Sequence, residues 1–187
     1  AAAGDDLTAL RDKACEAFRA ACRVDTRCQP VADRSPCEFV TPPLAPHKFT
    51  FILEPLTAPF RLNFELKSDR EPFVALAEDL TEESIFAEIN IGGWGNKKSV
   101  IRPCNSETAG CTTVQVEHHE AGIVNALESR PFWVEYKDGV VTVGKGQQHA
   151  FLEWDAGQYR GRVPSTVRIG IASYHIAPAY WVFFQFC

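Results

Sequence analysis

The sequence predicts an all-β fold, an antiparallel β-sandwich of the jelly-roll type, preceded by a short disulfide-stapled helical extension. From about residue 47 onward, short runs of β-branched and aromatic residues are separated by turn formers. Several runs alternate strictly between apolar and polar residues. Seven cysteines in 187 residues indicate disulfides. We therefore expect a helical cap and connector over 1–45 and the sandwich domain over 46–187.

The first segment, 7–23, carries apolar residues at a helical rhythm and contains neither glycine nor proline. On a helix, Cys15 and Cys22 share a face but lie about 10 Å apart along the axis. A disulfide holds its Cα atoms within about 7 Å, so these two cannot bond each other. Their nearest candidate partners are Cys28 and Cys37, which gives a stapled N-terminal cap.

A proline-rich connector follows, with "TPPLAP" at 41–46, and it favours extended chain without a helix. Beyond it lie ten strand candidates, one of which contains a complete hairpin. They cover residues 47–53, 60–66, 73–79, 85–91, 97–102, 112–118, 132–146, 150–155, 167–174 and 179–186.

Two of these runs are especially clear. In 60–66 every second residue is Phe or Leu, so one face of the strand is apolar and the other polar. In 132–146 the dipeptide Asp138-Gly139 supplies the two residues of a type I′ hairpin turn. Such hairpins are typical of antiparallel sandwiches.

The remaining cysteines lie in or after the predicted strands. Cys104 and Cys111 bracket "NSETAG", a segment of turn formers, and we expect them to close this loop as a pair. Cys187 is then the odd cysteine, either free, bonded within the cap or joined to a second chain as a homodimer. The chain contains no methionine and begins "AAAGDD", so we expect that a signal peptide was removed and that the protein is secreted.

Four stretches, taken in order, resemble the domain named after crustacean farnesoic acid O-methyltransferase. They cover residues 73–102, 132–146, 151–155 and 167–186. The Gly-Gly-Trp-Gly-Asn…Ser-x-Ile-Arg motif at 92–102, the Phe-Trp-Val block at 132–134 and the Val-Gly-Lys-Gly turn at 143–146 make the resemblance specific. The resemblance covers about 60–186. The family name implies methyl transfer from S-adenosylmethionine to the carboxylate of farnesoic acid.

The residues themselves favour no catalytic site and no cofactor. The glycine-rich motif lies between two predicted strands, whereas a nucleotide-type site needs a helix after the glycines. No G-x-S-x-G nucleophile motif is present. His118 and His119 are neighbours on a predicted strand, so they point to opposite faces and do not favour a metal site.

The stretch "IGGWGNKKSVIR" is either a strand-to-strand turn with a packing anchor or the floor of a binding site. In the second interpretation an exposed indole stacks on sugar C–H faces while amide, ammonium and guanidinium groups read hydroxyls. A second aromatic and polar mixture occurs in "SYHIAPAYW", although Trp181 there is expected in the core. The predicted ligand-binding residues are Trp94, Asn96, Lys97, Arg102, Tyr174 and His175.

The net charge of −5 and the scattered basic residues argue against nucleic acid, and no apolar run is long enough to span a membrane. We therefore predict a secreted, non-catalytic module that binds a carbohydrate or a small hydrophobic ligand. Two alternatives stay open: a methyltransferase acting on farnesoic acid, and a disulfide-linked extracellular assembly protein.

Overall fold

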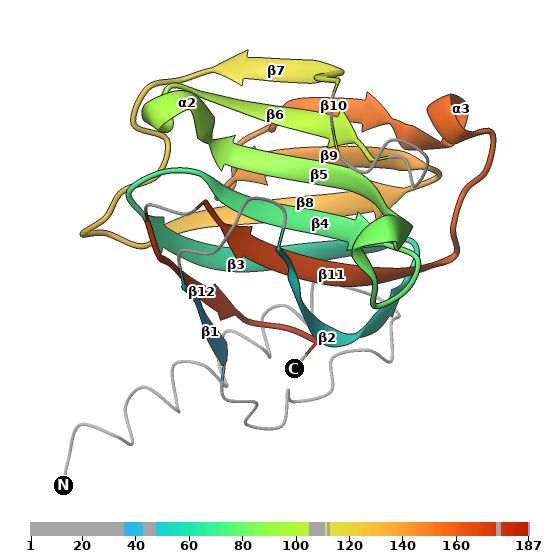
Figure 1. Ribbon diagram of the computed structural model, residues 1–187, viewed down its shortest axis with the longest axis horizontal. Coiled ribbons are helices and arrows are strands. Elements are labelled where there is room, and N and C mark those ends of the chain that lie inside the picture. Colours follow the sequence, from blue (N-terminus) through green and yellow to red (C-terminus); the bar gives the residue numbers. More distant parts are fainter. Residues whose placement is uncertain (1–35, 43–47, 105–110, 112, 175–176, 187) are drawn as a thin grey trace, which may run out of the picture. The chain divides into compact units, whose positions relative to one another are not determined.

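The computed structural model describes residues 36–42, 48–104, 111, 113–174 and 177–186. Two six-stranded antiparallel sheets pack face to face (Figure 1). Sheet A has the strand order β1 (Cys37–Thr41), β12 (Ala179–Phe183), β3 (Phe60–Ser68), β8 (Arg130–Lys137), β9 (Val140–Lys145) and β10 (Ala150–Asp155). The predicted antiparallel sandwich is therefore confirmed.

Sheet B has the order β2 (Thr50–Thr57), β11 (Thr166–Ser173), β4 (Pro72–Ala77), β5 (Ile85–Gly92), β6 (Lys98–Pro103) and β7 (Val116–His119). Three short helical turns complete the described elements: η1 (Glu82–Ser84), α2 (Gly93–Asn96) and α3 (Ala156–Arg160). In Figure 1, α2 and α3 lie at opposite ends of the strands.

The core lies between the sheets and is formed by the alternating residues that the sequence singles out. Along β3, Leu62, Phe64 and Leu66 are buried, while the residues between them are at least partly exposed. Trp181 is buried as expected and contacts Phe64 with 5.8 Å between ring centroids. The two inner faces thus form one continuous apolar cluster.

Two turns follow the local sequence. Asp138 and Gly139 both have positive φ, 51° and 85°, as the predicted type I′ hairpin between β8 and β9 requires. A disulfide joins Cys104 to Cys111, the pair expected from the loop between them. Cys37 is also disulfide-bonded.

The first strand lies earlier than the sequence suggests. β1 pairs with β12 from Cys37 to Thr41, a segment that the predicted boundary at residue 46 places in the connector. Prolines on both sides of this segment suggest extended connector chain, but Thr41 is buried and accepts a hydrogen bond from the Trp181 indole Nε1 at 3.0 Å. The predicted helical cap, with Cys15, Cys22 and Cys28, and the odd Cys187 lie outside the described residues.

Candidate functional site

The turn α2 connects β5 to β6 and has an unusual backbone. Gly92, Trp94, Gly95 and Asn96 all have φ between 52° and 70°, the left-handed region. Glycine is required at two positions for further reasons of space. A Cβ on Gly92 would lie 2.8 Å from Val124 Cγ2, and a Cβ on Gly93 would lie 2.4 Å from Asn90 Oδ1. The glycines of the motif are therefore explained by the turn itself.

Trp94 is not explained in the same way. Its φ is 52°, a conformation that costs a residue with a side chain about 1 kcal/mol or more. Its side chain is 47% exposed, whereas Trp133, Trp154 and Trp181 are all buried. The turn thus holds a large aromatic ring in solvent on a backbone that disfavours it, and such strain is concentrated at functional sites.

Three titratable side chains form a series of contacts that begins at Trp94, and Lys98 is the one that contacts the ring. The Lys98 ammonium lies 4.3 Å from the Trp94 ring centroid, and it donates to Glu117 at 2.7 Å. His119 lies opposite Lys98 in the β6–β7 register, and its Nε2 is 3.0 Å from the Glu117 carboxylate. The hydrogen bonds from Lys98 and then His119 lower the pKa of Glu117. We call Trp94, Lys98, Glu117 and His119 the tryptophan cluster.

Asn96 fixes the turn to the neighbouring loop. Its Nδ2 donates to the carbonyl oxygens of Val124 at 2.8 Å and Asp69 at 3.1 Å, and its Oδ1 accepts from the Val124 amide at 3.2 Å. The amide group is therefore engaged with backbone on both sides. Lys97 follows it, and its side chain is exposed.

Arg102 lies on the same face of β6 as Lys98, four residues further along the strand. It donates through Nη2 to Glu88, which is directly opposite on β5 and completely buried. Its guanidinium also faces Phe73 at 6.0 Å from the ring centroid. The pair forms a charged centre on the outer face of sheet B, further from the turn than the tryptophan cluster.

The predicted second group is only partly described. Tyr174 is half-buried and its backbone amide donates to the carbonyl of Glu71, whose own amide donates to the carbonyl of Gly92. These bonds place the end of β11 near the start of α2. His175 lies outside the described residues.

The two adjacent histidines of β7 face opposite ways, as the sequence predicts. His118 contacts Glu120, with 3.3 Å between Nε2 and Oε2, whereas His119 contacts Glu117. Burial raises the pKa of Glu120, but the hydrogen bonds from Lys145 and His118 outweigh this effect and lower it overall. In the described part of the chain, no three His, Cys, Asp or Glu side chains are grouped so that they could hold a metal ion.

Sequence reasoning identified Trp94 but missed Lys98, Glu117 and His119. Lys98 could have been found, because it shares the face of Arg102 by alternation along β6. Glu117 and His119 depend on the register between β6 and β7, which local sequence does not contain.

None of the described helices is long and apolar enough to cross a membrane.

The family model described as farnesoic acid O-methyltransferase matches residues 43–163. No match was found among curated proteins. Solved structures with a similar overall fold include the carbohydrate-binding module CBM66 from Bacillus subtilis, at 13% identity and a TM-score of 0.49, with 73% of this chain and 79% of that chain covered.

Two galectins are similarly distant. Galectin LEC-6 from Caenorhabditis elegans has 15% identity and a TM-score of 0.48 and covers 79% of this chain and 95% of its own. Chicken galectin 2 has 11% identity and a TM-score of 0.47 and covers 73% and 97%. Likenesses at this level carry no information about a ligand.

Proposed function

This chain belongs to the farnesoic acid O-methyltransferase domain family, and from that premise we propose that it is a secreted, non-catalytic module that binds carbohydrate through the tryptophan cluster. The observation that carries the proposal is the exposed Trp94 on a left-handed backbone. The ring is available to a ligand without any rearrangement of the core.

The chemistry around the ring suits a sugar. Apolar C–H faces of a pyranose stack on an indole, and hydroxyl groups pair with charged donors and acceptors beside it. Lys98 supplies ammonium donors and Glu117 supplies a carboxylate acceptor, both within the cluster. His119, with 69% of its side chain exposed, extends the polar rim.

The experiment is a glycan array followed by titration of each hit against matched variants. Trp94→Ala is expected to abolish binding. Tyr180→Ala is the control, because Tyr180 is an exposed aromatic with a lysine, Lys67, 4.7 Å from its ring centroid, but it lies on the other sheet. Binding that survives Trp94→Ala, or an array without hits at millimolar glycan, would refute the proposal.

Membership of the family supports a second candidate, methyl transfer from S-adenosylmethionine to an isoprenoid acid. The glycine-rich turn does not fit the cofactor. It joins two antiparallel strands, the amide of Gly92 already donates to Ser99 Oγ, and the amide of Lys97 donates to the Gly93 carbonyl. Calorimetry with S-adenosylmethionine and an assay for the methyl ester test this candidate, and heat together with product would favour it over carbohydrate binding.

A third candidate is covalent assembly through Cys187, which lies outside the described residues. Electrophoresis with and without reductant tests it. A dimer that appears only without reductant would support assembly, and a monomer under both conditions would exclude a covalent link. Disulfides at Cys37 and Cys104 are expected of a protein that works in an oxidising compartment.

A further inference from the structure

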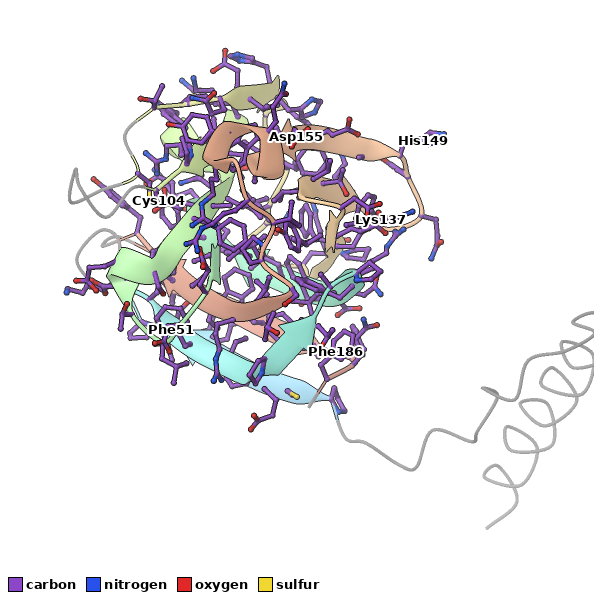
Figure 2. The ribbon with its side chains drawn as sticks, turned by 90° about the vertical axis from the view of Figure 1, so that its right-hand side faces the viewer. Phe51, Cys104, Lys137, His149, Asp155 and Phe186 are labelled. Carbon is purple, nitrogen blue, oxygen red and sulfur yellow. A yellow bond between two sulfur atoms is a disulfide. The ribbon has the colours of Figure 1, made fainter. Side chains whose placement is uncertain are left out.

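A pocket of about 390 Å³ lies at the opposite end of β5 from Trp94, in the size range of small-molecule sites. Ile85, the first residue of β5, and Cys104, just after β6, form part of its wall. β5 has eight residues, so the pocket and the turn α2 are about 25 Å apart. Figure 2 looks onto this end and labels Cys104 and Asp155, the residue that caps α3.

The polar lining comes from three separate segments. Glu78 follows β4, Glu83 and Ser84 belong to η1, and Tyr159, Arg160 and Arg162 belong to or follow α3. Ser84 stabilises the β4–β5 connection, because its hydroxyl donates to the carbonyls of Thr81 at 2.7 Å and Asp79 at 2.9 Å. These hydrogen bonds hold the backbone of η1, the turn that carries Glu83.

The two arginines share a single carboxylate oxygen. Arg162 Nη2 donates to Glu78 Oε1 at 2.6 Å, and Arg160 Nη2 donates to the same atom. A guanidinium carries five N–H donors, so most donors of the pair have no hydrogen-bond partner among the described residues. Arg160 Nη1 is buried without a partner among the described residues, and Arg162 keeps 64% of its side chain exposed. Arg162 thus keeps donors at the exposed rim of the pocket, whereas Arg160 lies deeper, with its guanidinium 4.9 Å from the centroid of the Phe86 ring.

The same pocket offers acceptors and an aromatic surface. Glu83 is exposed and has no hydrogen bond or ion pair with any described residue. Tyr159 is 56% exposed and packs its ring against Trp154 at 5.5 Å between centroids. Donors, a free carboxylate and a ring together match a ligand that has both an acid group and hydroxyls.

We propose that this pocket binds a small polyhydroxylated carboxylate such as a uronic acid. Arg162 and Arg160 would face the ligand carboxylate, and Glu83 would accept a hydrogen bond from a ligand hydroxyl. The lining holds two arginines and two glutamates, so its formal charge is zero. Because the charges of the lining cancel, the site has no net attraction for a phosphate or sulfate dianion, and binding depends on directional hydrogen bonds to a carboxylate and hydroxyls. The site is separate from the tryptophan cluster and goes beyond the function proposed above.

The test is calorimetric titration of the full chain with glucuronate and galacturonate, beside glucose, galactose, acetate and sulfate. Uronates are expected to bind at least about tenfold more tightly than the neutral sugars and than acetate or sulfate, the range of charge-assisted hydrogen bonds. Arg162→Gln is expected to weaken uronate binding by about tenfold or more. Arg70→Gln is the matched control, because that exposed arginine pairs with Asp69 rather than with a pocket residue.

Several results would overturn the proposal. They are absence of uronate binding, equal affinity for the neutral sugar, tighter binding of sulfate, or unchanged uronate affinity in Arg162→Gln. Should that variant not fold, Tyr159→Ala replaces it, and uronate binding is again expected to weaken. Loss of uronate binding in Trp94→Ala with full affinity retained in Arg162→Gln would place the uronate at the tryptophan cluster and overturn the pocket, whereas the reverse pattern would support the pocket, so failures of the two sites are distinguishable.

Discussion

The ammonium of Lys98 lies 4.3 Å from the ring centroid of Trp94, and the same nitrogen donates to Glu117 at 2.7 Å. One cation therefore links the aromatic ring to the carboxylate. Because Lys98 is in β6 and Glu117 in β7, the link runs from the turn across the edge of sheet B. The orientation of the exposed indole is thus coupled to the pairing of β6 with β7.

Replacing Lys98 is the first test of this coupling. In Lys98→Met the ring loses a cation–π contact of about 0.5–1 kcal/mol and Glu117 loses its nearest cation. We expect the free energy of unfolding to fall by no more than about 1 kcal/mol, because the Lys98–Glu117 ion pair lies close to the surface. Glycan affinity should fall in parallel. Lys67→Met beside Tyr180 is the control, and an equal loss of affinity there would contradict the assignment.

Asn96 should behave as a structural residue. Asn96→Ala removes three hydrogen bonds to the backbone of Asp69 and Val124 and places alanine at φ 62°. We expect the free energy of unfolding to fall by about 2–3 kcal/mol in urea denaturation. Lys97→Ala, at the adjacent exposed position, should stay within about 0.5 kcal/mol of the wild type. Equal stability of the two variants would show that the turn does not depend on the amide.

The pH dependence of the tryptophan cluster follows from Glu117. Its pKa is lowered from the ordinary 4.5 by the hydrogen bonds from Lys98 and His119. A carboxyl whose folded-state pKa is depressed contributes its stabilisation above its unfolded pKa and loses it as the pH falls through the folded value. Contact between Lys98 and Glu117 should therefore persist from pH 7 to below 4.5.

The measurement is an NMR titration of the Glu117 side-chain carboxyl in the wild type and in Lys98→Met. The midpoint should move upward in the variant. A midpoint at or above 4.5 in the wild type would contradict the contact.

Tyr136→Phe is a substitution that should not lower the free energy of unfolding. The tyrosine ring is fully buried and contacts Phe60 and Phe86, while its hydroxyl has no hydrogen-bond partner among the described residues. Burial raises the pKa of this hydroxyl. Tyr136→Phe keeps the packing and removes an unpaired polar group, so stability should be unchanged or higher by about 1 kcal/mol in thermal or urea unfolding. A loss of more than about 1 kcal/mol would show that the hydroxyl has a partner.

The Cys104–Cys111 disulfide should support both stability and the pocket that Cys104 lines. Replacing both cysteines with serine opens a loop whose closure is worth about 2 kcal/mol. We expect a corresponding fall in the free energy of unfolding and weaker uronate binding, with glycan binding at Trp94 retained. Unchanged uronate affinity would show that the pocket wall does not need the crosslink.

Local sequence predicted the elements whose pattern is complete within a few residues. The alternation over Phe60–Ser68 and the Asp138-Gly139 turn needed no distant information, and both are present. β1 was missed because its strand character comes from pairing with β12, some 140 residues away along the chain. Prolines near it made the local pattern that of a connector.

The residues of the candidate site also differ in whether local sequence predicts them. Trp94 was recognisable because its glycine neighbours mark a turn. Lys98, Glu117 and His119 come together through strand register, and Arg160 and Arg162 meet Glu78 across more than 80 residues. Such pairs depend on tertiary packing, for which a single sequence carries no periodic signal.

The most direct test of carbohydrate binding at Trp94 is a two-dimensional NMR titration of the indole N–H signals. The chain has four tryptophans, of which only Trp94 is exposed, so its signal can be assigned by comparison with Trp94→Ala. With a glycan hit from the array, we predict a saturable shift of the Trp94 indole signal, while those of Trp133, Trp154 and Trp181 stay in place. A bound glycan that leaves the Trp94 signal unmoved would contradict the proposed site.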